Sequence, residues 1–397
     1  MERRRRSAAL IAVAGLLMFE PLLPQSANLV STPYNQFGLD LFHQLRREKP
    51  SDNIFISPLS IAMALQMTYG GAAGETAAAM ARTLKLTGLA LPGANQAASE
   101  LLQKLKSSDS KVELLIANSL WARSGVRFND DFLASNRKYF GAEIASLDFA
   151  SPQALSRING WVDTTTKGKI PRIIERIDAQ TVMFLINAVY FKGRWQTEFD
   201  PRLTANTAFH IAAARQKQVA MMARSGSFQY LRGERFQAIG LPYGNGNVSL
   251  YVFLPDAGLS INDFLSRVND QTWNQWMTAF RRAHGDVKIP RFKMEYGREL
   301  KESLKALGMG IAFDTGKADF SGMRRERDLF IQQVTHKAVV EVNEEGTTAA
   351  AATSVSIGVT SVMVPSFTFV ADRPFLMAIR DQTTGVILFL GAVHDPQ

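Results

Sequence analysis

Cysteine is absent from this sequence of 397 residues. Its absence excludes disulfide bonds, thiol nucleophiles and thiolate metal sites, so the packed core must stabilise the fold by itself. Enzyme signatures are missing as well: there is no GxSxG elbow, no GxxxxGK[ST] phosphate loop and no GxGxxG turn. None of the five histidines has the i, i+4 partner of a helical HExxH zinc site. A dispersed Ser-His-Asp triad stays open because geometry defines it, but we expect no enzyme, no metal site and no cofactor.

The composition is that of a globular protein with a substantial core, with 46% hydrophobic and 20% charged residues. The net charge is +9, and it is still +7 without the first 27 residues (41 Lys and Arg against 34 Asp and Glu). The basic residues gather at Arg281, Arg282, Lys288, Arg291 and Lys293, at Arg324, Arg325 and Arg327, and more sparsely at Lys104, Lys106 and Lys111. We interpret them as solvated surface, with a glycosaminoglycan or other polyanion as the alternative partner. No nucleic-acid partner is expected.

The first 27 residues have the pattern of a secretory signal peptide. Four arginines, Arg3 to Arg6, precede an apolar run of twelve residues, Ala8 to Phe19. As a helix this run would span only ~18 Å, too short for a simple transmembrane segment. Cleavage after Ala27 fits weakly because Gln25 is not small, and an uncleaved tether is the alternative. The pattern predicts secretion, to the periplasm or outside the cell, and together with the missing cysteines it suits a prokaryotic exported protein.

Helices and strands are both indicated along the rest of the chain. Ser or Thr before Pro predicts helix starts at Ser31 and Ser57, and Ser260 begins another amphipathic stretch. β-branched and aromatic residues predict strands over 182–191, 248–254, 338–342 and 386–393. Several of these strands are apolar on both faces, so we expect an α+β domain with covered sheets.

A long charge-free segment, Gly346 to Val364, follows one of these strands and consists mostly of small residues. Connections of this length without structure of their own are usually functional or disordered. By composition alone, a low-complexity surface linker is one interpretation.

Several motifs together resemble the serpin family, in the family's order and across most of the chain. They are Asn53–Ile61, Asn187–Trp195, Leu307–Gly310, Ala318–Met323, Thr335–Ala338, Asn343–Thr347 and Phe369–Phe375. The resemblance implies one serpin domain over 28–397, with three β-sheets, about nine helices and an exposed reactive-centre loop at about 344–366. It also implies a monomeric suicide inhibitor of a serine protease, without a stable membrane partner. The protease cleaves the loop, forms a covalent acyl-enzyme and is trapped when the loop inserts into the main sheet. A non-inhibitory binding or chaperone-like serpin is the alternative.

The resemblance also assigns roles within the loop. The implied hinge consists of Glu344, Glu345, Gly346, Thr347, Thr348, Ala349, Ala350, Ala351, Ala352 and Thr353. The family's spacing from the hinge puts the cleaved bond between Thr360 and Ser361, beside Val359, Val362 and Met363. No Lys or Arg stands there, so we expect an elastase-like or subtilisin-like target. Fourteen residues, Thr347 to Thr360, would extend over ~46 Å as an inserted strand, and their alternate positions are small or β-branched.

Two supporting sites follow from the same resemblance. Ser57, Ser60, Asn187 and His336 match the shutter, where polar side chains hydrogen-bond beneath the strands that must part. Trp195, Arg291 and Glu344 match the breach, where an Arg–Glu pair holds the point at which the loop enters. Arg291 stands where the family usually has Lys.

Overall fold

The computed structural model describes residues 28–107, 109–178, 181–212, 215–346 and 365–396. In these residues the helices are α1 (Asn28–Glu48), α2 (Pro58–Tyr69), α3 (Gly74–Thr83), α4 (Leu91–Ser107), α5 (Asp130–Phe140), α6 (Pro152–Thr165), α7 (Ile261–Leu265), α8 (Asp270–Ala279) and α9 (Lys301–Leu304). Three short helical turns are η1 (Pro201–Leu203), η2 (Lys305–Met309) and η3 (Gly310–Phe313). The strands are β1 (Ile54–Ile56), β2 (Val112–Arg123), β3 (Glu143–Leu147), β4 (Met183–Gly193), β5 (Ala205–Ala212), β6 (Arg215–Gly233), β7 (Phe236–Tyr243), β8 (Val248–Pro255), β9 (Arg281–Pro290), β10 (Phe292–Glu299), β11 (Gln333–Val342), β12 (Phe367–Val370), β13 (Phe375–Asp381) and β14 (Ile387–Val393).

Local sequence signals explain several of these elements. Ser57 caps α2 by accepting a hydrogen bond from the backbone N–H of Ser60, and Pro58 occupies the first turn, where its missing N–H has no intrahelical partner to lose. Ser260 caps α7 in the same way. α1 differs from the expectation: it begins at Asn28, ahead of Ser31, and contains Pro33. The four predicted strands are present, and β11 begins five residues earlier than predicted, at Gln333.

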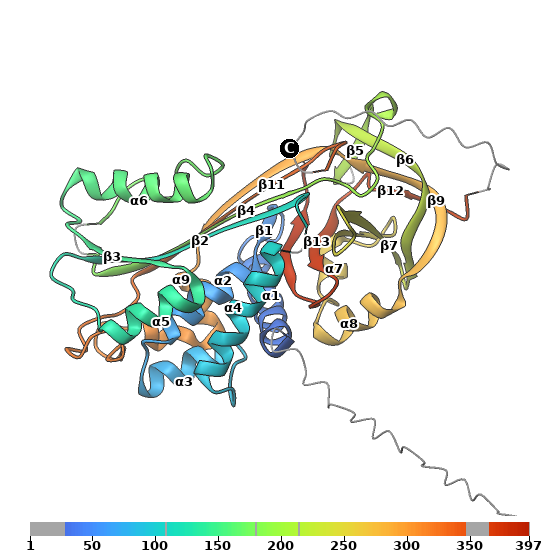
Figure 1. The fold of residues 1–397 in the computed structure, drawn as a ribbon. Coiled ribbons are helices and arrows are strands. Elements are labelled where there is room, and N and C mark those ends of the chain that lie inside the picture. Colours follow the sequence, from blue (N-terminus) through green and yellow to red (C-terminus); the bar gives the residue numbers. More distant parts are fainter. Residues whose placement is uncertain (1–27, 108, 179–180, 213–214, 347–364, 397) are drawn as a thin grey trace, which may run out of the picture.

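The five-stranded sheet has the order β10-β11-β4-β2-β3. Its central strand β4 is buried along almost its entire length, because helices cover both faces. On one face α6 packs through Ile158 and Val162, and on the other α2 contacts β4 and β2. Figure 1 shows α6 alone on one side of this sheet and the cluster that contains α2, α4 and α5 on the other.

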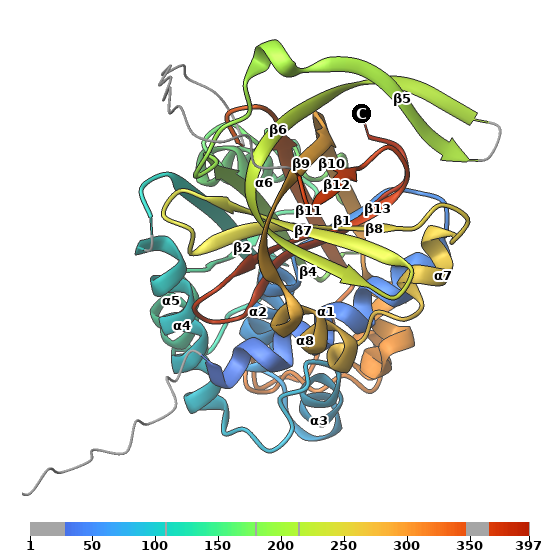
Figure 2. The same cartoon turned by 90° about the vertical axis from the view of Figure 1, so that its right-hand side faces the viewer.

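The remaining strands form one hydrogen-bonded network, β1-β14-β13-β8-β7-β6-β9-β12, with β5 paired to β6. The 19-residue strand β6 divides it. Its first seven residues pair with β5, its last five pair with β7, and the ten residues from Met221 to Tyr230 pair with β9. The expected second and third sheets are therefore two sectors that share β6, and the β5–β6 hairpin reaches outward from them (Figure 2).

Candidate functional site

The junction between β4 and β11 lies at the centre of the five-stranded sheet. These strands run parallel and pair directly, from Gln333 opposite Phe184 to Val339 opposite Tyr190. This direct pairing stops there, although each strand continues for three more residues, to Val342 and Gly193. In the described part of the sheet, β4 and β11 are thus paired at the centre but not with each other at the upper end, where β11 pairs with β10 and β4 pairs with β2.

A line of polar side chains crosses the closed centre. Asn118 of β2 lies opposite Asn187 of β4, which lies opposite His336 of β11. The Asn187 amide nitrogen donates to the Asn118 Oδ1 at 2.5 Å, to the Ser60 carbonyl at 3.0 Å and to the Ser60 hydroxyl. These side chains are at most 6% exposed, so each hydrogen bond is made away from water. The network ties three strands to the start of α2.

The partners of His336 define its protonation. Its Nδ1 lies 2.6 Å from the Asn187 Oδ1, a pure acceptor, so Nδ1 carries the proton. Its Nε2 lies 3.4 Å from the backbone N–H of Ser57, a donor, so Nε2 must accept. Complete burial lowers the pKa of His336 to about 3, because the charged form would lose its hydration. The site therefore requires a neutral histidine, held in one tautomer.

Trp195 anchors the upper end of the sheet. Its indole N–H donates to the Asn343 carbonyl at 2.8 Å, and its ring stacks on Tyr243 with 4.3 Å between the centroids. Its backbone N–H donates to the Glu345 carbonyl at 2.9 Å. Trp195 is 3% exposed, so the start of the loop is attached to β4 through a buried aromatic side chain and a backbone hydrogen bond.

Glu344 occupies the middle of this end. Its Oε1 accepts a hydrogen bond from the Thr204 hydroxyl at 2.8 Å, and Arg291 NH1 lies 3.6 Å from the same oxygen. The Arg291 side chain is 54% exposed while that of Glu344 is 10% exposed, so solvent screens the ion pair from the arginine side. The shorter contact to Thr204 and a backbone hydrogen bond from Phe199 to the Glu344 carbonyl fix the position of Glu344.

Gly346 is the first residue of the charge-free segment and the only one of that segment that the structure describes. Its φ of +131° disfavours any side chain, and a Cβ there would lie 2.1 Å from the Gly193 carbonyl oxygen. Gly346 forms an antiparallel bridge with Arg194, and the Asn343 side chain accepts from the N–H groups of Glu345 and Gly346. The turn at the end of β11 needs glycine here because the backbone passes directly over β4.

The structure brings together the two sets of side chains that the resemblance named. Ser57, Ser60, Asn187 and His336 form one hydrogen-bonded group, and Trp195, Arg291 and Glu344 lie together at the end of the sheet. Of the named hinge, the structure describes only Glu344, Glu345 and Gly346. The other hinge residues Thr347, Thr348, Ala349, Ala350, Ala351, Ala352 and Thr353 lie outside the described residues, as do Val359, Thr360, Ser361, Val362 and Met363.

Three residues of these sites were not predicted from the sequence. Asn118 belongs to the central network, Thr204 holds Glu344, and Asn343 closes the turn. A signal existed only for Asn343, since Asn at the first position of a turn and Gly at the fourth, here Gly346, are typical of a turn that the Asn side chain stabilises. Asn118 sits 69 residues from Asn187, and no local pattern marks their pairing.

Two further properties concern the described residues alone. No helix among them is long and apolar enough to cross a membrane. They also contain no group of three or more His, Asp or Glu side chains arranged to hold a metal ion.

This chain is similar to known proteins in both sequence and structure. A family model described as Serpin (serine protease inhibitor) matches residues 32–396. The leukocyte elastase inhibitors of Bos taurus and Homo sapiens are 37% and 35% identical to this chain, over 92% of it and 99% of their own length. Among solved structures, native Tengpin, a thermophilic serpin, matches with a TM-score of 0.86 and 31% identity over 95% of this chain and 96% of its own. Human thyroxine-binding globulin matches with a TM-score of 0.87 and 28% identity, over 94% and 100%.

The prediction of a secreted protein is wrong. The two leukocyte elastase inhibitors match over 99% of their length, but only 92% of this chain is covered, and the family match begins at residue 32. These relatives therefore have no counterpart of the basic and apolar segment on which that prediction depended. They are mammalian, so they give no support to a prokaryotic source either.

Proposed function

The chain belongs to the serpin family, and on that premise we propose that it is a suicide inhibitor of a serine protease, not an enzyme. The observation that carries this proposal is the closed parallel junction of β4 and β11, with the loop attached at its unpaired end. A family model described as serine protease inhibitor and relatives named for elastase inhibition support the same reaction class.

The direction of the strands suits insertion. The chain leaves the end of β11 at Gly346, so a segment that folds back between β11 and β4 would run antiparallel to both. One parallel ladder would become two antiparallel ladders, which are slightly more stable per residue. A gain of about ten backbone hydrogen bonds at ~1 kcal/mol each would contribute on the order of 10 kcal/mol. The uninserted form would then store free energy comparable with the stability of a domain.

Insertion also requires the central network to break. Asn187 and His336 now lie on adjacent strands with 2.6 Å between the bonded atoms. A strand between them would move their backbones to about twice the inter-strand spacing of ~4.8 Å. In this proposal Ser57, Ser60, Asn187 and His336 act as the shutter, while Trp195, Arg291 and Glu344 act as the breach.

The loop composition defines the target class. The proposed reactive-centre loop covers about 344–366, with cleavage between Thr360 and Ser361. Val359, Val362 and Met363 flank this bond and offer no cation to a trypsin-like pocket. Elastase-like or subtilisin-like proteases, whose pockets take small apolar side chains, fit this sequence.

Incubation with pancreatic elastase and with subtilisin tests the proposal. We expect a complex that survives SDS electrophoresis, and a released C-terminal peptide that begins at Ser361 by mass spectrometry. Thr347→Arg places a charge on the face that insertion would bury and should convert the inhibitor into a substrate. Thr348→Arg is the matched control, because its side chain would stay on the outer face, and it should still form the complex. If Thr347→Arg retains full inhibition, insertion is not the mechanism.

Cleavage without complex formation would favour a binding protein with the same fold. The structural match to thyroxine-binding globulin is the observation that favours such a binding protein. The two candidates also differ in thermal behaviour: an inserting loop raises the unfolding temperature after cleavage, whereas a loop that cannot insert leaves it unchanged.

A further inference from the structure

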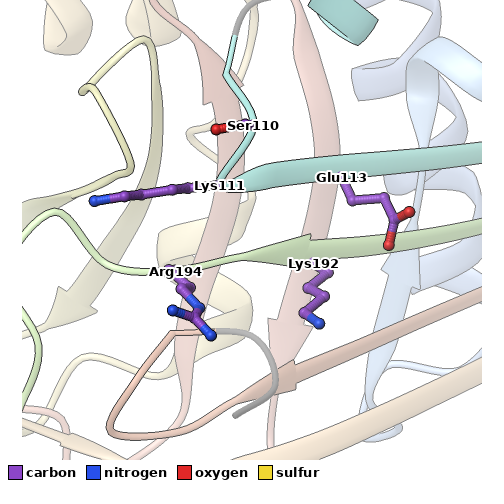
Figure 3. Close-up of a pocket in the computed structure, with 5 residues that line it drawn as sticks. All are labelled: Ser110, Lys111, Glu113, Lys192 and Arg194. Atoms are coloured by element: carbon purple, nitrogen blue, oxygen red, sulfur yellow. The ribbon is translucent and has the colours of Figure 1, made fainter. Parts of the chain in front are cut away.

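A cavity of about 360 Å³ lies at the edge of the upper end of the five-stranded sheet. It is lined by Ser110, Lys111 and Glu113 at the start of β2 and by Lys192 and Arg194 at the end of β4. Figure 3 shows Lys192 and Arg194 projecting from this end of β4 in the same direction. The proposed mechanism of inhibition uses none of the side chains that line the cavity.

Strand register explains why these cations meet. Glu113 lies opposite Lys192, and the backbone N–H of Arg194 donates to the Lys111 carbonyl at 3.0 Å. Because side chains alternate between the faces of a strand, Lys111 and Glu113, two positions apart, lie on the same face as Lys192 and Arg194. It is the face covered by α6, opposite to the face that holds Asn187. The cavity and the polar network of the sheet centre are therefore separate sites on one strand.

The cavity keeps an excess of positive charge. Glu113 is engaged in an ion pair with Lys167. The nearby Asp109 carboxylate accepts hydrogen bonds from the backbone N–H groups of Lys111 at 2.8 Å and Asn245 at 2.6 Å. Within the described part of the chain, the ammonium groups of Lys111 and Lys192 have no acidic partner.

We propose that this cavity binds a small polyanion that carries at least two phosphate or sulfate groups. The three cations come from two adjacent strands, so a single ligand can contact both, and charge-assisted hydrogen bonds to such oxyanions are among the strong ones. The volume falls in the range of ligand pockets, ~300–1,000 Å³, so one isolated oxyanion would fill only part of it. The Ser110 hydroxyl supplies a further donor.

The site is coupled to the loop through Arg194. The side chain of Arg194 lines the cavity, while its backbone bridges Gly346 and its carbonyl accepts from the N–H of Gly244 at 2.8 Å. A bound polyanion that holds Arg194 therefore stabilises the docked hinge and slows insertion. This coupling depends on the proposed inhibitory function, whereas the binding itself does not.

Isothermal titration calorimetry on the full chain tests the binding, with tripolyphosphate and a sulfated heparin disaccharide as separate probes at low ionic strength. We expect saturable one-to-one binding, which Lys192→Gln and Arg194→Gln each weaken about tenfold, the effect of one charge-assisted hydrogen bond. Arg325→Gln removes the same charge from an exposed residue between η3 and β11 and should change the affinity less than about twofold. A preference for one probe identifies phosphate or sulfate as the natural group.

Two results would overturn the site: no saturable binding of either probe at millimolar concentration, or equal weakening by Arg325→Gln and Lys192→Gln, which would indicate diffuse attraction to a basic protein. The coupling has its own measurement, since tripolyphosphate should slow the formation of the SDS-stable elastase complex for the unmodified chain but not for Arg194→Gln. An unchanged rate despite binding refutes the coupling. If no complex forms at all, the inhibitory function fails while the calorimetric result still stands.

Discussion

Different kinds of interaction stabilise the centre and the upper end of the five-stranded sheet. At the centre, Asn118, Asn187 and His336 form short neutral hydrogen bonds in a dry environment. At the upper end, Glu344 meets a half-exposed arginine at 3.6 Å, and β4 and β11 are no longer paired with each other. An unmade hydrogen bond in the core is expensive, whereas water replaces most of a screened ion pair. If the proposed insertion takes place, we therefore expect the sheet to open from its upper end, where the loop is attached.

Removing the Asn187 side chain should have the largest effect on stability, because it disrupts the more strongly held centre of the sheet. Asn187→Leu leaves the His336 Nδ1–H and the Asn118 oxygen buried without their partner. We expect a loss of about 3–5 kcal/mol in the free energy of unfolding, measured by urea denaturation. Asn206→Leu, at an exposed position of β5, is the control and should stay within ~0.5 kcal/mol. Equal losses in the two variants would show that the network does not hold the sheet.

Lowering the pH should destabilise the centre of the five-stranded sheet before its upper end. The pKa of His336 is about 3 in the fold and ~6.5 in the unfolded chain, so the unfolded state binds the proton first. This contribution is fully present above pH 6.5 and is lost as the pH falls towards 3. Between pH 7 and pH 5 it amounts to about 2 kcal/mol.

The matched variant for this pH dependence is His336→Gln, which cannot titrate. Burial also lowers the pKa values of His43 and His394, and they add a slope of the same sign to both proteins. The difference between the two denaturation series isolates His336. Parallel curves for the variant and the unmodified chain would mean that His336 does not remain neutral in the fold.

A side chain at Gly346 should loosen the upper end while leaving the centre intact. Gly346→Ala places a Cβ against the Gly193 carbonyl at an unfavourable positive φ, a strain of about 1–3 kcal/mol. The hinge should then leave Arg194, and the amide of Trp195, which donates to Glu345, should exchange hydrogen faster. Gly297→Ala on β10 has open space around its Cβ and should leave that exchange unchanged. Unaltered protection of Trp195 in Gly346→Ala would contradict a docked hinge.

Loss of the arginine at the upper end should have the smallest effect. Arg291→Gln removes an ion pair that is screened on one side, so we expect a loss below ~1 kcal/mol by urea denaturation. Thr204→Val removes the 2.8 Å hydrogen bond to the same carboxylate and should cost more, about 1–2 kcal/mol. A larger effect for Arg291→Gln would reverse our view of which contact positions Glu344.

Local signals in the sequence were sufficient for much of the fold and for part of the site. The Ser57–Pro58 pair predicts the start of α2, and continuous apolar runs predict β4, β8 and β14. The resemblance led to Asn187 and His336, which the fold places 2.6 Å apart. Two features were not predicted because no local pattern marks them. The first is the start of β11 at Gln333, and the second is the role of Thr204, which lies in the connection between η1 and β5. Their roles depend on what packs against them, which no residue pattern records.

By itself, the sequence determined a cysteine-free core and a loop segment without charge, both of which are properties of composition and local pattern. Only the tertiary structure decided that β4 and β11 pair directly, that Asn118, Asn187 and His336 lie in one line, and that Lys111, Lys192 and Arg194 surround one cavity. The physical reason is register. Asn187 is 69 residues from Asn118 and 149 from His336, and a shift of one residue between such distant strands would turn every one of these side chains to the opposite face.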